Sequence, residues 1–80
     1  MSLEEAESVF FDENALLIPD PDHSNAEDRF LLLGMSAQIR LLVVCHCFRE
    51  TGSVIRIISA RRAGARERQQ YGDSSQKKTL

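Results

Sequence analysis

The stretch RFLLLGMSAQIRLLVVCHCFRETGSVIRII, residues 29–58, decides the fold. Three segments within it, residues 29–35, 39–48 and 54–58, have the length and the continuous apolar or β-branched character of strands. Only short links separate these segments, and short links between strands imply an antiparallel meander. Gly34 lies inside the first segment and indicates either a bulge or the close approach of another part of the backbone.

The residues before this stretch predict an amphipathic helix and one short additional strand. Ser2 and Glu5 have the spacing of a capping box, and apolar residues then recur at helical spacing, so residues 3–11 are expected to be helical. Residues 15–18 favour a short extra strand. Residues 19–25 contain two prolines and several short polar side chains, which favour an irregular loop.

The residues after this stretch predict a C-terminal helix. Ser59 is expected to be its N-cap, residues 60–71 its body and Gly72 its end. Residues 73–80 are polar and lack periodicity, so they are expected to form a disordered tail after a single domain of residues 1–72. The predicted fold class is α+β, with an N-terminal helix, a three-stranded antiparallel meander that has room for the short extra strand, and an arginine-rich C-terminal helix.

The charges are divided unequally along the chain. Residues 1–28 hold nine acidic and no basic residues, whereas residues 29–80 hold ten basic and three acidic ones, and eight of those ten are arginine. Arginine is favoured where a planar side chain makes two hydrogen bonds to a phosphate or a carboxylate. Either the acidic part neutralises the basic part within the fold, or the basic part presents a cationic surface to a polyanion.

Arginines open the predicted C-terminal helix, although the helix dipole disfavours cations at that end. Arg61 and Arg62 occupy this position, and Arg62 and Arg66 form a like-charge pair one turn apart. A phosphate bound at the helix start would remove both conflicts, because free N–H groups and guanidinium groups would converge on it. This cluster is therefore a candidate anion site.

Arg56 interrupts an otherwise apolar strand, so its charge must reach solvent, a carboxylate or a ligand. Arg40 and His46 share one face of the preceding strand by the period of two, and they line the same surface as Arg56 if the register allows it. His46 would suit acid-base chemistry near neutral pH. The alternative to an anion site is a solvated helix face on which Glu67 pairs with a sheet arginine such as Arg56 or Arg40.

The spacing of metal-ligating residues argues against a metal site. Cys45 and Cys47 lie two residues apart on a strand, which is too far for an unstrained disulfide, and His46 faces the other side. Buried, reduced cysteines are expected instead. The acidic residues within positions 12–22 match no calcium-loop spacing. We expect no metal and no cofactor.

The chain has no segment of the ~18 apolar residues that a membrane helix needs. Residues 1–10 carry three glutamates and no basic residue, which is unlike a secretory or transit leader. A cytoplasmic protein without membrane contact is expected. Because 80 residues bury only a small core, we also expect a partner chain to support the fold.

A series of short motifs carries a resemblance to a known family. The motifs are PDPDHS at 19–24, EDRF at 27–30, LGMS at 33–36, RLLVV at 40–44 and IRIISARRA at 55–63, followed by Glu67, Arg68 and Tyr71. With LEEA at 3–6 and VF at 9–10, the chain resembles the BrnT family of bacterial type II toxins. The resemblance implies a RelE-like ribonuclease fold, metal-independent RNA cleavage that blocks translation, and a BrnA-type antitoxin as partner.

The resemblance also implies roles for individual residues. In such enzymes a base activates the ribose 2′-hydroxyl, basic side chains hold the phosphate, and an acid assists the leaving oxygen. Glu67 and His46 would do the acid-base work, and Tyr71 would stack on a base. The candidates are Arg56, Arg61, Glu67 and His46 for catalysis, and Arg40, Arg62, Arg66, Arg68 and Tyr71 for binding RNA and its phosphates.

One departure from the family pattern concerns the sheet edge. Family members usually begin with a further strand and helix, which this chain does not contain. An exposed sheet edge would invite pairing with a second chain, so a homodimer is expected. The alternative to a ribonuclease is a catalytically inactive, truncated module that binds an acidic antitoxin segment or nucleic acid through its arginine face.

Overall fold

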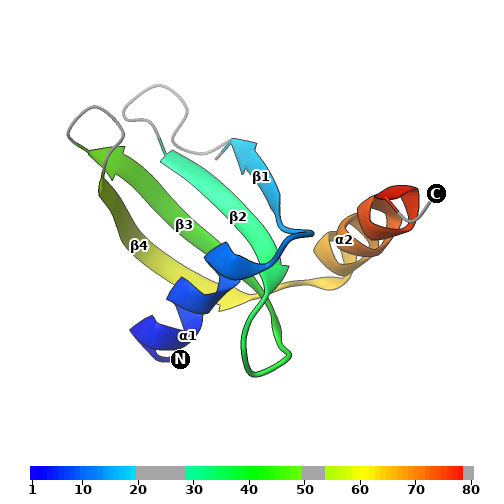
Figure 1. The fold of residues 1–80 in the computed structure, drawn as a ribbon, viewed down its shortest axis with the longest axis horizontal. Coiled ribbons are helices and arrows are strands. Elements are labelled where there is room, and N and C mark those ends of the chain that lie inside the picture. The colour runs from blue at the N-terminus through cyan, green and yellow to red at the C-terminus, as the bar shows by residue number, and fades with distance from the viewer. Residues whose placement is uncertain (20–28, 50–53, 79–80) are drawn as a thin grey trace.

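The computed structural model describes residues 1–19, 29–49 and 54–78, so the predicted loop of residues 19–25 lies, apart from Pro19, outside the described residues. Figure 1 shows the arrangement of the elements along the chain. In order they are helix α1 (Leu3–Ser8), a 3₁₀ turn η1 (Val9–Phe11), strands β1 (Leu16–Pro19), β2 (Arg29–Met35), β3 (Leu41–Arg49) and β4 (Val54–Arg62), and helix α2 (Ala65–Lys78).

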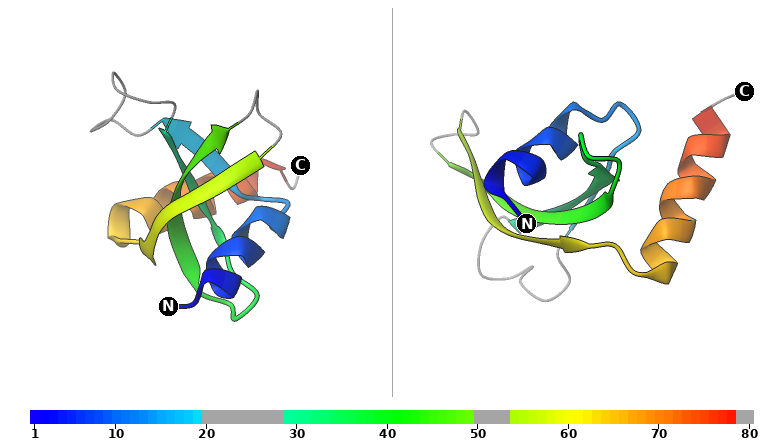
Figure 2. Two further views of the ribbon diagram at one scale, coloured as in Figure 1. Left: turned by 90° about the vertical axis from the view of Figure 1, so that its left-hand side faces the viewer. Right: turned by 90° about the horizontal axis from the view of Figure 1, so that it is seen from below.

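The four strands form one antiparallel sheet in the order β1-β2-β3-β4. This confirms the predicted α+β class, with the short extra strand as the fourth member. The sheet curves around α1, whereas α2 stands at one end of the molecule (Figure 2). One buried cluster, centred on Val9, Leu42 and Val44, lies with α1, and a second, centred on Leu33 and Val43, lies with α2.

Helix α1 begins where the sequence predicts it. The hydroxyl oxygen of Ser2 accepts a hydrogen bond from the backbone N–H of Glu5 at 3.1 Å, so Ser2 is the N-cap. The Glu5 carboxylate is turned to other partners, in the loop between β2 and β3. The predicted capping box is therefore only half formed, because Glu5 has a charged partner to satisfy.

Gly34 marks a close approach of backbone and helix, one of the two possibilities that its position predicts. A Cβ atom at residue 34 would lie 2.9 Å from Val9 Cγ1 and 3.0 Å from Ala15 Cβ. Both distances are shorter than normal carbon contacts. The absence of a side chain at residue 34 thus lets the η1 segment pack directly on β2.

The predicted start of the C-terminal helix is wrong. Strand β4 continues through Ser59 to Arg62, so Ser59 is no N-cap and Arg61 and Arg62 belong to the sheet. Their positions in the sheet are fixed by pairing with β3, where Arg61 lies opposite Val43 and Arg62 opposite Leu42. Pairing with a buried central strand overrides the local helix signal.

Helix α2 begins instead after Gly64, which the sequence places inside the helix. The Gly64 carbonyl oxygen accepts the N–H of Arg68 at 3.0 Å, and the Gly64 N–H donates to Glu67 Oε1 at 2.8 Å. Gly64 and Glu67 therefore form the helix cap. The helix continues through Gly72 to Lys78, so the predicted end at Gly72 is also wrong, and residues 73–78 form its last turns.

Candidate functional site

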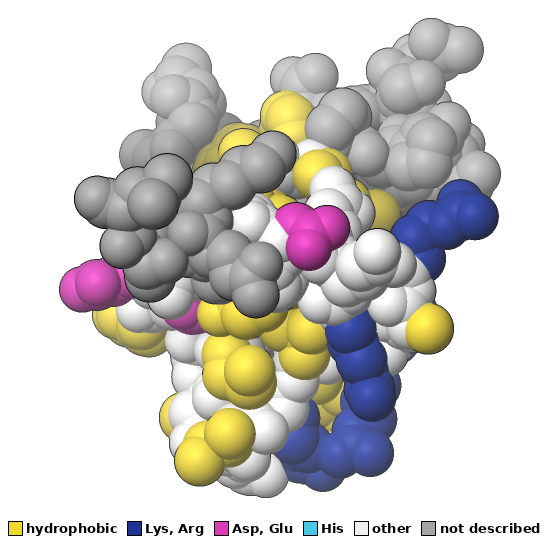
Figure 3. All heavy atoms as spheres, turned by 90° about the vertical axis from the view of Figure 1, so that its right-hand side faces the viewer, with side chains coloured by type: hydrophobic (Ala, Val, Ile, Leu, Met, Phe, Trp, Pro, Cys, Tyr) yellow, Lys and Arg dark blue, Asp and Glu magenta, His cyan; other side chains and the backbone are white. Residues whose placement is uncertain are grey.

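Three arginines from separate parts of the chain meet at one hollow. Arg40 lies just before β3, Arg62 ends β4, and Arg68 lies in the first turn of α2. The hollow has a volume of about 370 Å³ and is lined by Met35, Ile39, Arg40, Leu41, Arg62 and Arg68. Lys and Arg side chains gather along one margin of this end of the molecule (Figure 3). We call it the arginine hollow.

Two of these arginines have uncompensated charges. Within residues 1–19, 29–49 and 54–78, the guanidinium groups of Arg62 and Arg68 make no hydrogen bond or ion pair. Both residues are exposed. Two cations held near each other without carboxylate partners favour the binding of an anion.

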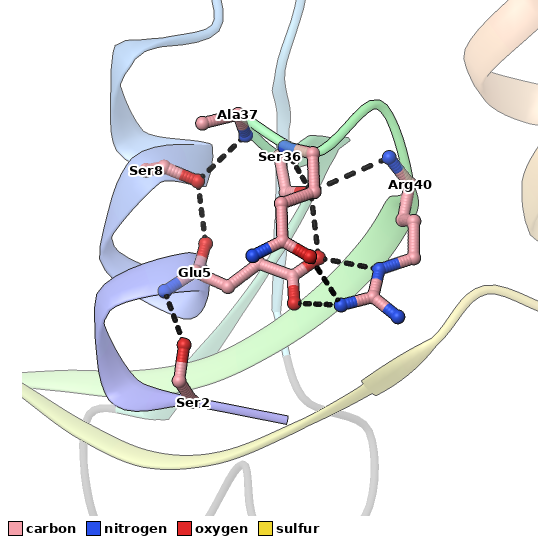
Figure 4. A network of polar contacts seen from close by, with 7 residues as sticks. Ser2, Glu5, Ser8, Ser36, Ala37 and Arg40 are labelled. Atoms are coloured by element: carbon pink, nitrogen blue, oxygen red, sulfur yellow. Dashed lines mark hydrogen bonds and ion pairs between the residues drawn. The ribbon is translucent and has the colours of Figure 1, made fainter.

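Arg40 is held in place by a buried carboxylate (Figure 4). Its Nε donates to Glu5 Oε2 at 2.8 Å, and its Nη2 donates to Glu5 Oε1 and, at 2.7 Å, to Gln38 Oε1. Glu5 is 3% exposed, and its Oε2 also accepts the hydroxyl of Ser36 at 2.8 Å. Hydrogen bonding from Arg40 lowers the pKa of Glu5 against the opposing effect of burial.

The remaining nitrogen of the Arg40 guanidinium is not used by this network. In Figure 4 this nitrogen points away from Glu5, and no dashed line starts from it. Among the described residues Nη1 makes no hydrogen bond. Arg40 thus combines a fixed orientation with a donor that is free to meet a ligand at the arginine hollow.

Arg61 and Glu67 form a second arginine–carboxylate pair. Arg61 Nη1 and Nη2 donate to Glu67 Oε1 and Oε2 at 2.8 and 2.7 Å. Hydrogen bonding from Arg61 first, and then from the Gly64 N–H, lowers the pKa of Glu67 to about 2 against some desolvation. Glu67 is therefore ionised at neutral pH and has no proton to donate. It does pair with a sheet arginine, but that arginine is Arg61 rather than Arg56 or Arg40.

Arg56 lies apart from the other candidates. It is opposite Cys47 in the β3–β4 register, and successive side chains alternate between the faces of a sheet. Arg56 therefore does not share the surface of His46, in contrast to the predicted surface. It lines a separate hollow between α1 and β4. Arg66 is exposed on α2 and is not part of the arginine hollow.

His46 is a core residue. It is 1% exposed and packs against three aromatic rings, with ring centroids 5.0 Å from Phe10, 6.2 Å from Phe30 and 5.3 Å from Phe48. Its Nδ1 lies 3.3 Å from the Val44 carbonyl oxygen. Burial lowers the pKa of His46, which favours the neutral imidazole. Its role here is packing, because a substrate would not reach the ring.

Tyr71 ties α2 to the rest of the molecule. Its hydroxyl donates to Asp12 Oδ2 at 2.6 Å, and its ring packs against the cluster of Leu33, Val43 and Ala63. Asp12 Oδ2 also accepts the Met35 N–H at 2.8 Å. The Tyr71 ring is thus already in contact with the core, whereas base stacking would need an open face.

Sequence reasoning missed two polar residues that organise the site. Glu5 lies next to Ala6 and one turn before Val9, so it is a carboxylate on the buried face of an amphipathic helix. Such a group requires a charged partner, and this signal could have pointed to Arg40 or another arginine. Asp12 links η1, β2 and α2, but its spacing to Met35 and Tyr71 contains no local signal.

The described residues contain no candidate metal centre. Cys45 and Cys47 are free cysteines and are partly rather than fully buried. Across residues 1–19, 29–49 and 54–78, no three side chains of His, Cys, Asp or Glu come together in a way that could hold a metal ion. In the same part of the chain, no helix is long and apolar enough to span a membrane.

An α+β protein with a curved antiparallel sheet and arginines gathered at one end has the features of a polyanion-binding domain. Residues 1–67 match the family described as ribonuclease toxin, BrnT, of type II toxin-antitoxin system. The chain belongs to this family, which confirms the resemblance seen in its motifs. Family membership implies an antitoxin partner and an RNA substrate. Comparison with curated proteins gave no match.

Proposed function

We propose that this chain is a toxin that cleaves RNA without a metal ion and so blocks translation in the cytoplasm, with a BrnA-like antitoxin as its inhibitor and a RelE-like fold. The observation that carries the proposal is the arginine hollow, in a chain that belongs to a ribonuclease toxin family. Guanidinium groups suit this task because they bind phosphate through paired hydrogen bonds and stay charged at any physiological pH.

The reaction would be an attack by the ribose 2′-oxygen on the adjacent phosphorus. The O2′–P bond forms, the P–O5′ bond breaks, and the products are a 2′,3′-cyclic phosphate and a free 5′-hydroxyl. Negative charge grows on the non-bridging oxygens in the transition state, where fixed cations stabilise it most. Arg61 is the proposed catalytic cation, because it precedes Arg62 at the end of β4 and Glu67 holds its guanidinium group in one orientation.

Glu67 has a different role in this proposal from the acid-base role that the sequence suggests. With a pKa of about 2 it is a weak base, so it contributes little to removing the 2′-hydroxyl proton. Its two hydrogen bonds fix the plane of the Arg61 guanidinium instead. The protons pass to and from water. His46 and Arg56 have no part in the proposed reaction.

The test is an RNA cleavage assay on the purified 80-residue chain in the presence of EDTA. We expect cleavage to continue in EDTA, and Arg61→Ala to reduce its rate by about 10²- to 10³-fold, the usual effect of losing one charge-stabilising group. Arg29→Gln is the control, because it removes one positive charge at the far end of β2. Full activity of Arg61→Ala, or loss of cleavage in EDTA, would contradict the proposal.

A second candidate function is binding without cleavage. It is favoured by the state of the predicted acid-base residues, because His46 is buried and Glu67 is ionised and paired. A module of this kind would bind RNA, or an acidic antitoxin segment, in a salt-sensitive manner and leave RNA intact. Intact RNA together with salt-sensitive RNA binding by the folded chain would support this candidate over the ribonuclease.

A homodimer is proposed as the assembled form. Strand β4 ends the described sheet, and its Val54 and Ile55 side chains are 45% and 47% exposed. Beside it lies the hollow of about 730 Å³ between α1 and β4. An exposed edge next to apolar side chains supports pairing with a second chain. Light scattering of the purified chain would give the mass, and a monomer at micromolar concentration would contradict the proposal.

A further inference from the structure

The loop that connects β2 to β3 presents an apolar side chain at the rim of the arginine hollow. Ile39 is 82% exposed and lines this hollow together with Arg40, Arg62 and Arg68. An isoleucine so exposed gains nothing from burial in the described fold. Its position beside three guanidinium groups gives the hollow both a cationic and an apolar part.

The backbone holds Ile39 in an unfavourable conformation. Its φ of 60° lies in the left-handed region, and it is the only non-glycine residue in the described part of the chain with a positive φ. A β-branched residue is strained there, and such strain persists only where the surroundings enforce it. A glycine or asparagine at this position would serve the turn better, so the turn itself does not account for an isoleucine.

The surrounding hydrogen bonds do enforce this conformation. The Ile39 N–H donates to the Ser36 carbonyl oxygen at 2.9 Å, and the Ser36 N–H donates to the Arg40 carbonyl oxygen at 2.8 Å. The Ala37 N–H donates to the Ser8 hydroxyl oxygen at 2.8 Å, which ties the loop to α1. Glu5 fixes both Ser36 and Arg40 from the same helix. These hydrogen bonds therefore fix the positions of Ile39 and Arg40 in the loop.

We propose that the arginine hollow is a subsite for one nucleotide of single-stranded RNA, in which Arg40, Arg62 and Arg68 hold the phosphate and Ile39 packs against the attached base. The inference rests on the proposed function, action on RNA, and specifies which part of the RNA this site binds, namely one phosphate and its base. An apolar contact to a base face tolerates any sequence, and it requires an unpaired base, which excludes a continuous duplex.

The charges of the subsite fit a phosphodiester. Arg62 and Arg68 carry uncompensated charges, and Arg40 keeps one donor free while Glu5 neutralises part of its charge. The positive charge therefore exceeds what a single phosphodiester carries, which favours retention of the bound phosphate. The free chain thus presents a site that is already formed, and binding needs little rearrangement.

The experiment measures binding separately from cleavage. The probe is a fluorescently labelled, single-stranded 2′-O-methyl oligonucleotide, which lacks the nucleophile for cleavage, and anisotropy is recorded over a series of salt concentrations. Arg62→Gln and Arg68→Gln are each expected to weaken binding about tenfold. Each should also reduce the slope of log affinity against log salt by about 0.7, the value for one phosphate contact to a single strand. Arg29→Gln is the charge-matched control and should change neither strongly.

Ile39→Gly separates a binding role from a structural one. This substitution removes the apolar contact and relieves the strained φ, so the melting temperature should rise while oligonucleotide affinity falls about fivefold or more, as the loss of a partly buried aliphatic side chain predicts. The salt slope should stay that of the wild type, because no phosphate contact is lost. A residue that only shaped the loop would not lower affinity while raising stability.

The outcomes distinguish this inference from the proposed function. Weaker binding by the hollow variants, with RNA left intact by the wild type, would retain the subsite and reject the ribonuclease. RNA cleavage by the wild type, with unchanged oligonucleotide binding in Arg62→Gln, Arg68→Gln and Ile39→Gly, would overturn the subsite and leave the ribonuclease standing. A third outcome uses a poly-glutamate peptide as competitor of the oligonucleotide. If the peptide competes equally well in wild type and Ile39→Gly, and Ile39→Gly keeps its RNA affinity, the subsite is also overturned. The hollow would then bind any polyanion.

Discussion

Helix α1 has six residues and α2 has fourteen, yet the shorter helix is the one buried in the core. In α1, Glu5 and Ala6 are 3% and 2% exposed, and the following Val9 is fully buried. In α2, none of the described side chains at positions 65–74 is buried. Helix length therefore does not measure contribution to the fold. The short helix packs against the sheet, and the long helix exposes charged side chains to solvent.

The two arginine–carboxylate pairs repeat this contrast. The side chains of Arg40 and Glu5 are 37% and 1% exposed, whereas those of Arg61 and Glu67 are 58% and 21% exposed. The first pair joins residues 35 apart in sequence, and the second joins residues six apart. The two pairs therefore have different structural roles. The Arg40–Glu5 pair connects a helix to a distant loop, whereas in the Arg61–Glu67 pair the carboxylate orients a guanidinium group close to it in sequence.

The largest expected effect tests the tight packing beneath η1. Gly34→Ala places a methyl group 2.9 Å from Val9 Cγ1 and 3.0 Å from Ala15 Cβ, so backbone or side chains must shift. We expect a loss of about 1–3 kcal/mol in the free energy of unfolding, as for other overpacked cores. Urea denaturation measures it. Stability equal to that of the wild type would show that η1 does not pack on β2 as described.

A smaller effect on stability is expected when the hydrogen bond that attaches α2 to the rest of the molecule is removed. Tyr71→Phe removes the 2.6 Å hydrogen bond to Asp12 and keeps the ring, so it should cost about 1 kcal/mol. Because the ring remains, RNA affinity should change little if Tyr71 is an anchor. A large loss of RNA affinity with unchanged stability would instead assign the hydroxyl to the substrate. Thermal melting and oligonucleotide anisotropy on one preparation measure both.

The boundary between β4 and α2 shows what sequence can and cannot provide. The strands of residues 29–35 and 54–58 are predictable because their apolar pattern is local. Ser59 followed by Ala60 is an equally local helix signal, but pairing with β3 keeps both residues in the strand. A single sequence does not show how strongly a segment pairs with a distant strand, so the local signal predicts the following arginines at the start of the helix.

The sequence predicts which arginines are candidates for the site, but it does not predict which of them meet at the arginine hollow. The excess of arginine after residue 28 identifies the cationic half of the chain, and three of those arginines do meet. Their meeting depends on the β3–β4 register, which contains an irregularity between Cys45 and His46. That irregularity has no signature in the sequence. For the same reason, the predicted common surface of Arg56 and His46 does not exist.

Gly72→Ala should act in the opposite direction to Gly34→Ala. Gly72 lies within α2, and a Cβ atom there would meet nothing within 4 Å. Replacing glycine by alanine in a helix interior stabilises the helix by roughly 0.5–1 kcal/mol. Urea denaturation should therefore show a gain. A loss would mean that α2 ends before residue 72, which would restore the helix end expected from the sequence.

The smallest expected effect concerns the exposed ion pair. The pKa of Glu67 falls from its ordinary 4.5 to about 2 in the folded chain, so the stabilisation it gives is complete above pH 4.5 and is lost as pH falls through 2. Because the pair is largely solvated, Glu67→Gln should cost only ~0.5 kcal/mol at pH 7. The difference between wild type and variant should shrink as the pH approaches 2, and it should also shrink in 1 M salt at pH 7, where exposed charges are screened. Persistence of the difference in 1 M salt would mean that the Arg61 pair is shielded from water like the Glu5 pair, and the contrast between the two pairs would fail.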